Sequence, residues 1–162
     1  MDFELKTLTL SRICSEKCDA LLVLIPQDFQ SGDDALSALV ALALKSGDLE
    51  AKAGKLLSAY RMPRIAATRV LLAGVGDGSP KNTRSAVTAA MGALKTGKVG
   101  RVVLCLSALS GQQPDTVRAA VVACSEAAYA YATTKSRASS EKLQQVVIAV
   151  NHAGTAKTAF DN

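Results

Sequence analysis

The chain has 162 residues, of which 49% are apolar, 20% charged and only 4% aromatic, with no tryptophan. This predicts a single folded domain with a core of Ala, Leu and Val, and excludes a disordered chain or a ligand cage lined by aromatic rings. The formal net charge is +5, but residues 1–80 carry nine Lys/Arg and ten Asp/Glu, whereas residues 81–142 carry nine and three.

The start of the chain argues against export, because Met1–Glu4 provides neither a basic nor an apolar leader segment. No apolar run approaches the length of a membrane-spanning helix. The four cysteines are Cys14, Cys18, Cys105 and Cys124. The first two are four residues apart and could share a helix face, and the other two lie in apolar runs that suit a core. We therefore expect a cytoplasmic protein with reduced thiols and no membrane partner.

The N-terminal part predicts two strands. Asp2–Thr9 alternates apolar and polar side chains, which is typical of a half-exposed strand. Ser11–Asp19 is polar and turn-like. Ala20–Ile25 is a continuous apolar run, which is typical of a central strand buried on both faces.

A helix is expected after the loop at Gln27–Gly32. Asp33 and Asp34 precede apolar residues at helical spacing, and acidic residues suit the start of a helix. Lys45 falls in the last turn, and Gly47 suits the residue that ends the helix.

Two strands should then form an antiparallel pair. Gly54–Tyr60 and Arg69–Gly74 are separated by a short turn at Arg61–Ala67, which contains Pro63. Parallel neighbours need a crossover of about a dozen residues or more, so a connection this short favours antiparallel pairing. The sheet is therefore expected to be mixed.

The C-terminal part alternates helices and strands. The expected elements are a helix at Ser79–Thr96 that ends at Gly97, a strand at Arg101–Ser107, a loop at Gly111–Gln113, a helix from Pro114, a polar connection at Thr133–Lys142 and a strand at Leu143–Val150. Right-handed crossovers place such helices on both faces of the sheet. The predicted fold is a three-layer α/β/α domain with a mixed, mostly parallel sheet.

Gly74–Gly78 is the first candidate site. A glycine-rich turn between a strand and a helix can cradle phosphate with backbone N–H groups. The spacing departs from the dinucleotide-binding pattern G-x-G-x-x-G, and no acidic residue ends the next strand. The alternative interpretation is a tight structural turn.

The remaining candidates do not complete a catalytic constellation. They are Asp33 with Asp34, Asp48 with Glu50, His152, Ser107, Ser110 and Cys105. The acidic pairs could act as acid and base or hold a metal, but their places at helix ends favour capping. With one histidine in the sequence, a Cys/His zinc site is not expected.

Lys95, Lys98 and Arg101 form a basic cluster around the end of the second predicted helix. Basic side chains there complement the helix dipole. The alternative is a patch for a phosphate backbone, although no aromatic residue lies among these charges to stack on bases.

The order of several short motifs resembles a known family. They are Cys18-Asp19-Ala20-Leu21-Leu22, then Lys45-Ser46-Gly47-Asp48-Leu49-Glu50-Ala51-Lys52-Ala53-Gly54, then Arg69-Val70-Leu71-Leu72-Ala73-Gly74-Val75-Gly76, and last Tyr129-Ala130-Tyr131 with Lys135-Ser136. Together they resemble the N-terminal domain of the leucyl aminopeptidases, the cytosol aminopeptidase family. The likeness covers roughly residues 1–150.

This resemblance implies a macro-domain-like module at 1–150, followed by a linker at 151–162 towards a catalytic domain that holds two metal ions, Zn²⁺ or Mn²⁺. It implies that the whole enzyme removes N-terminal residues from peptides as a hexamer. The family's N-T-D-A-E-G-R signature has no match in residues 1–162, so no catalytic, cofactor-binding or metal residue is carried over. We expect this chain alone to be inactive and to serve assembly and access to the active sites.

A binding module is the alternative from a different class. One form binds ADP-ribose or another nucleotide at Gly74–Gly78, and a titration with ADP-ribose would detect this binding. The other binds DNA through the basic residues 81–142, with an affinity that falls steeply with salt.

Overall fold

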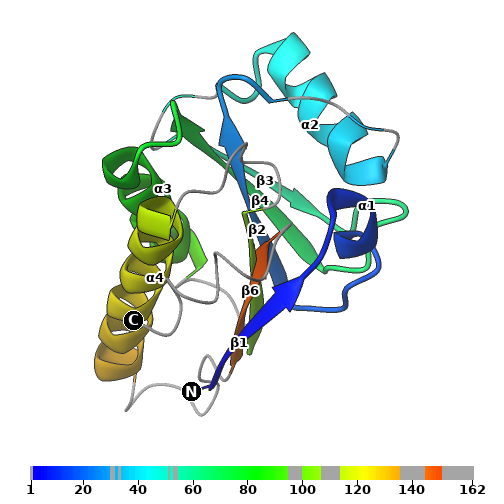
Figure 1. The fold of residues 1–162 in the computed structure, drawn as a ribbon. Coiled ribbons are helices and arrows are strands. Elements are labelled where there is room, and N and C mark those ends of the chain that lie inside the picture. The colour runs from blue at the N-terminus through cyan, green and yellow to red at the C-terminus, as the bar shows by residue number, and fades with distance from the viewer. Residues whose placement is uncertain are drawn as a thin grey trace.

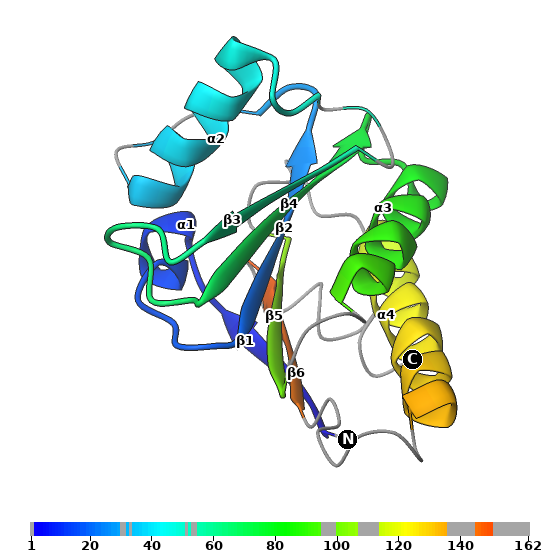
Figure 2. The same ribbon diagram turned by 180° about the vertical axis from the view of Figure 1, so that it is seen from behind.

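The structure is a computed structural model that describes residues 2–29, 32, 34–50, 52, 55–94, 100–106, 114–135 and 145–150. In chain order the elements are β1 (Asp2–Thr7), α1 (Leu10–Ile13), β2 (Ala20–Pro26), α2 (Ala35–Ser46), β3 (Leu56–Tyr60), β4 (Arg69–Gly76), α3 (Pro80–Ala93), β5 (Arg101–Cys105), α4 (Pro114–Lys135) and β6 (Gln145–Val150). The strands form one sheet of order β1-β6-β5-β2-β4-β3. Helices α1 and α2 cover one face and α3 and α4 the other (Figures 1 and 2), which confirms the predicted three layers.

The strand pairing is mixed and mostly parallel, as predicted. Four pairs are parallel, and only β3 and β4 run antiparallel, as their short connection requires. Strand β2 lies between β4 and β5, and all of its residues are buried. This confirms the central strand expected from its apolar run.

Each face of the sheet carries its own apolar cluster. Leu22 and Leu24 of β2 point to the cluster under α3 and α4, and the alternate residues Leu21, Val23 and Ile25 point to the cluster under α1 and α2. This period of two follows from the pleat of a strand. Helices of the same chain therefore cover both apolar clusters.

The helix ends follow the chemistry expected from the sequence. Asp34 caps α2 by accepting hydrogen bonds from the Ser37 N–H at 2.7 Å and the Ser37 hydroxyl at 2.8 Å. Gly47 ends α2 with φ +85°. Ser79 caps α3 by accepting from the Asn82 N–H at 3.3 Å, and Pro80 occupies the first turn. These side chains and the glycine satisfy backbone groups that a helix leaves unpaired.

Several element bounds differ from the prediction. Strand β4 continues past Gly74 to Gly76, α4 runs into the predicted connection as far as Lys135, and the turn-like segment before β2 contains the short helix α1. The expected helix end at Thr96 and Gly97, the loop at Gly111–Gln113, residues 136–144 and the tail 151–162 lie outside the described residues.

Replacing Gly47 by alanine is expected to lower the free energy of unfolding by about 1–2 kcal/mol, because a Cβ disfavours the left-handed conformation. A Cβ at Gly47 would meet no atom within 4 Å, so the cost comes from the backbone alone. Gly92 is the matched control: it lies in α3 with no atom within 4 Å, so Gly92→Ala should stabilise by about 0.5–1 kcal/mol. Urea unfolding measures both, and shifts of the same sign would contradict the expectation.

Candidate functional site

The glycine-rich turn after β4 is smaller than the sequence predicted. Gly74 is a strand residue: it is paired with Ile25 of β2, and its N–H donates to the Lys55 carbonyl at 2.9 Å. Of the three glycines in this segment, only Gly76 and Gly78 have positive φ, +60° and +75°. The expected three-glycine turn at Gly74–Gly78 was wrong in this respect, because pairing with β2 and with the chain ahead of β3 extends the strand.

The polar groups of this turn mostly form hydrogen bonds with one another. The Asp77 carboxylate accepts from the Ser79 N–H and from the Asn82 side-chain amide, both at 2.9 Å. The hydrogen bond from the Ser79 N–H is the main reason that the pKa of Asp77 is lowered. The carbonyl of Gly78 accepts from the Thr116 hydroxyl at 3.1 Å. A phosphate placed here would compete with the Asp77 carboxylate for the start of α3.

The acidic candidates at the ends of α2 are also engaged locally. Asp34 caps the helix, and Asp48 accepts from the Ser46 hydroxyl at 3.0 Å. Glu50 is exposed. The other candidates, Asp33, Ser107, Ser110, His152, Lys95 and Lys98, lie outside the described residues.

The four cysteines are reduced thiols buried in the core. Cys14 follows α1 and Cys18 lies in the segment before β2, so they do not share a helix face, although both join the cluster under α1 and α2. Burial raises the pKa of Cys18 to about 11 and that of Cys124 to about 12. The thiolate is the reactive form, so these cysteines are unsuited to nucleophilic chemistry at neutral pH.

A polar network at the amino ends of the parallel strands was not predicted from the sequence. Arg101, the first residue of β5, donates to the Gln145 side-chain oxygen at 2.9 Å, to a Glu16 carboxylate oxygen at 2.8 Å and to the Lys17 carbonyl. The same Glu16 oxygen accepts from Lys6 at 3.1 Å. Arg101 and Lys6 both lower the pKa of Glu16, with the Arg101 hydrogen bond as the largest cause.

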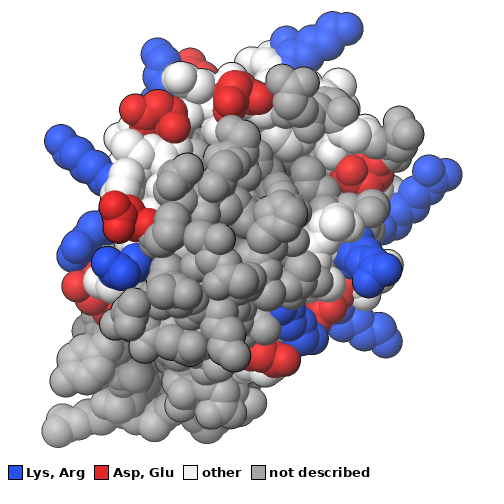
Figure 3. Space-filling view, viewed as in Figure 1, with Lys and Arg blue, Asp and Glu red and all other residues white. Residues whose placement is uncertain are grey.

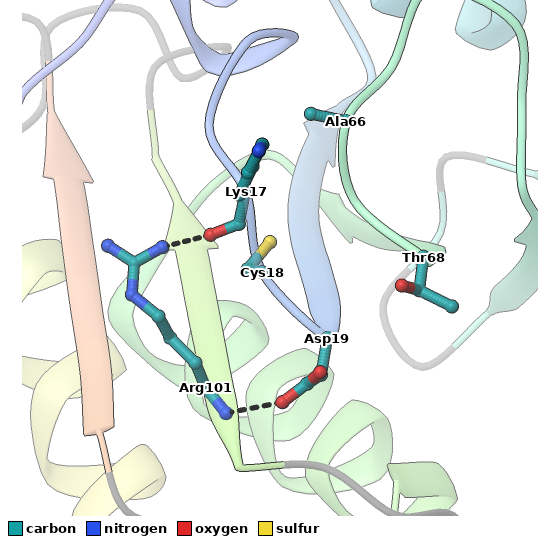
Figure 4. Close-up of a pocket in the computed structure, with 6 residues that line it drawn as sticks. All are labelled: Lys17, Cys18, Asp19, Ala66, Thr68 and Arg101. Carbon is teal, nitrogen blue, oxygen red and sulfur yellow. Dashed lines mark hydrogen bonds between the residues drawn. The ribbon is translucent and has the colours of Figure 1, made fainter.

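Asp19 completes this corner of the sheet. One of its carboxylate oxygens accepts from the Gly100 and Arg101 N–H groups at 2.8 and 2.9 Å, which fixes the start of β5 beside the start of β2. Figure 4 shows the hydrogen bonds from Arg101 to the Asp19 carboxylate and to the Lys17 carbonyl. A shallow cavity of about 410 Å³ lies beside these residues. The cavity is lined by Lys17, Cys18, Asp19, Ala66, Thr68 and Arg101.

The residues that line the cavity serve to hold neighbouring chain segments together. The side chains of Arg101 and Asp19 form hydrogen bonds with neighbouring segments of the chain. The raised pKa of Cys18 keeps its thiol protonated. The cavity also lies at the amino ends of the parallel strands, whereas sheets of this kind usually bind ligands at the carboxyl ends. Within the described part of the chain, no three His, Cys, Asp or Glu residues gather where they could hold a metal ion. Among the same residues, no helix is long and apolar enough to cross a membrane.

The fold is a three-layer α/β/α domain, and it resembles those of solved macrodomains and of a leucine aminopeptidase. The chain aligns with the Trypanosoma brucei macrodomain in complex with ADP-ribose at a TM-score of 0.67 and 13% identity, over 98% of this chain and 68% of that one. It aligns with a tomato leucine aminopeptidase mutant at a TM-score of 0.72 and 16% identity, over 99% of this chain and 35% of that one. At these identities the likeness concerns the fold.

Sequence comparison gives the family. Residues 20–138 match the model of the cytosol aminopeptidase family, N-terminal domain. The chain is 70% identical to the probable cytosol aminopeptidase of Polaromonas sp. (strain JS666) and 65% identical to that of Polaromonas naphthalenivorans, each over 99% of this chain. The chain belongs to the cytosol aminopeptidase family and corresponds to its N-terminal domain, which confirms the resemblance seen in the sequence. It spans about a third of the length of these relatives, 32%.

Proposed function

We propose that this chain is the non-catalytic N-terminal domain of a cytoplasmic aminopeptidase that removes N-terminal residues from peptides. The observation that carries the proposal is the family match over residues 20–138, together with relatives that are three times as long and are named probable cytosol aminopeptidases. The domain then serves assembly of a homo-hexamer and access of peptides to the active sites.

The proposed organisation is a module at 1–150 and a linker at 151–162 that leads to the catalytic domain. Strand β6 at Gln145–Val150 is the last element that the structure describes. Two divalent metal ions, Zn²⁺ or Mn²⁺, belong to that catalytic domain in this proposal. The part of the chain that the structure describes has no group of three candidate ligands, so these metals do not fit there and no chemical step is assigned to it.

Binding of ADP-ribose or another nucleotide is the second candidate, supported by the macrodomain-like fold. The residues of the turn give it little further support, because Asp77 occupies the start of α3. Binding of DNA through residues 81–142 also stays a prediction. The basic residues there whose side chains are described are Lys81, Arg84, Arg101 and Arg118, of which the last three contact carboxylates of this chain.

The 162-residue chain is expected to show no turnover of a chromogenic leucine amide with added Mn²⁺, because it carries no proposed catalytic residue. A full-length protein containing this chain, assayed in parallel with the same metal, should be active. The measurement is release of the chromophore over time. Turnover by the chain alone, or a full-length protein that cleaves no peptide substrate, would contradict the proposed function.

A further inference from the structure

Helix α2 is apolar on almost every side. Nine of its twelve residues are Ala, Leu or Val, and Lys45 is its only charged residue. A helix that is apolar all round is normally buried on all sides. Among the described residues, only one side of α2 packs against the rest of the chain.

The covered side packs on the sheet through Leu36, Val40 and Ala43. The opposite side carries Ala38 and Leu42, which are exposed, and Ala41, which is half-buried. Leu42 is 65% exposed, the largest fraction among the exposed large apolar residues of the described chain. We call Ala38, Ala41 and Leu42 the outer face of α2.

The helical layer on the other side of the sheet has a different surface. Lys81 and Arg84 on α3 and Arg118 and Glu126 on α4 are exposed, and Arg84 pairs with Glu126 across the two helices at 2.8 Å. Figure 3 shows Lys/Arg and Asp/Glu interspersed along the left flank, over α3. The charged surface of α3 and α4 is typical of a surface in contact with water, whereas the apolar outer face of α2 is typical of a surface that another part of a protein covers.

Polar groups border the outer face at both ends of the helix. Asp34 lies at its start, and Lys45, Asp48 and Glu50 lie at or just beyond its end, the last three being exposed. An apolar centre with a polar rim is the usual composition of a protein interface. The small side chains of Ala38 and Ala41 permit close approach of a partner, and Leu42 is the large apolar side chain exposed beside them.

We propose that the outer face of α2 docks against the region that follows this chain in the full-length protein. This rests on the proposed function, in which that region is the catalytic domain. The relatives are three times as long as this chain, and the match to an N-terminal domain places the additional length after it. Strands β6, β5 and β2 run parallel, so the carboxyl end of β6 lies on the same side of the sheet as the carboxyl end of β2, where the connection to α2 begins. In both views α2 lies towards the carboxyl ends of these strands (Figures 1 and 2).

Thiol footprinting tests this docking directly. Leu42→Cys places a thiol on the outer face of α2, and Val122→Cys places a control thiol on α4, where Val122 is 38% exposed. The native cysteines give a low background, because all four are at most 8% exposed. Each variant is made in the 162-residue chain and in the full-length protein, and the rate of maleimide labelling is measured by mass spectrometry. Unlabelled native thiols report that each variant has folded.

The Leu42→Cys thiol is expected to react at least tenfold more slowly in the full-length protein than in the 162-residue chain. The Val122→Cys thiol should react at similar rates in both. Equal labelling of the Leu42→Cys thiol in the two proteins would overturn the proposal. Protection that disappears when the full-length protein is diluted to a monomer would also overturn it, because a second copy would then be the cover.

Peptidase activity measured on the same full-length samples separates this inference from the proposed function. An active protein in which the Leu42→Cys thiol is unprotected refutes the docking alone. A protein that protects this thiol but cleaves no peptide refutes the proposed function and leaves the docking to the downstream region in place.

Discussion

Leu22→Ala is expected to lower the free energy of unfolding of the 162-residue chain by about 3–5 kcal/mol. Leu22 of β2 is fully buried and stands between Leu71 of β4 and Leu104 of β5, so the three leucines form a row across the middle of the sheet. Removing three carbons leaves a cavity that neighbours held in a hydrogen-bonded sheet refill poorly. The loss is a large fraction of the roughly 5–15 kcal/mol that stabilises a typical domain.

Urea unfolding followed by far-ultraviolet circular dichroism measures this effect, since the chain has no tryptophan. Leu42→Ala is the matched control, because Leu42 is 65% exposed and alanine is a good helix former. Its free energy of unfolding should change by no more than about 0.5 kcal/mol in the isolated chain. Equal losses for the two variants would show that the central row is not the core of the domain.

Arg101→Met is expected to lower the free energy of unfolding by about 2 kcal/mol at pH 7, the magnitude typical of hydrogen bonds to charged groups. The substitution removes the guanidinium that joins Glu16, the Lys17 carbonyl and Gln145, while methionine keeps much of the aliphatic packing. Arg118→Met is the control: Arg118 contacts Asp115 only at 3.9 Å, and both side chains are largely exposed. An exposed pair of this kind contributes about 0–1 kcal/mol.

The effect of Arg101→Met should also depend on pH. Because the pKa of Glu16 is lowered in the folded state from its ordinary 4.5, its stabilising effect is fully present above that value. It is lost as the pH falls through the lowered folded pKa, when the carboxylate takes up a proton. The difference between wild type and variant should therefore shrink in acid, and unfolding curves between pH 7 and pH 3 measure it. A difference that stays constant over this range would contradict the ion pair.

Features set by neighbouring residues were predictable from the sequence. The apolar run of β2, the cap at Asp34 and the glycine that ends α2 each depend on local chemistry, and the structure confirms them. The antiparallel pairing of β3 with β4 followed from the short connection between them. The three layers followed from the alternation of strands and helices, because right-handed crossovers place helices on both faces of a sheet.

Features set by distant residues were not predictable in this way. Arg101 was expected to serve the end of a helix with Lys95 and Lys98, but its partners Glu16 and Gln145 are 85 and 44 residues away in the sequence. The extension of β4 to Gly76 depends on pairing with β2. The cavity beside Asp19 arises where three chain segments meet, and no local pattern encodes it.

The pairing of β1 with β6 has a consequence for synthesis on the ribosome. The first strand hydrogen-bonds only to the last, and the contact between Glu4 and Gln145 joins residues 141 positions apart. At about 5–20 residues per second, β1 waits roughly 7–28 s for its neighbour to be made. During that interval β1 is an unpaired strand open to chaperones or to another nascent chain, so the sheet can close only when nearly all of the domain has been translated.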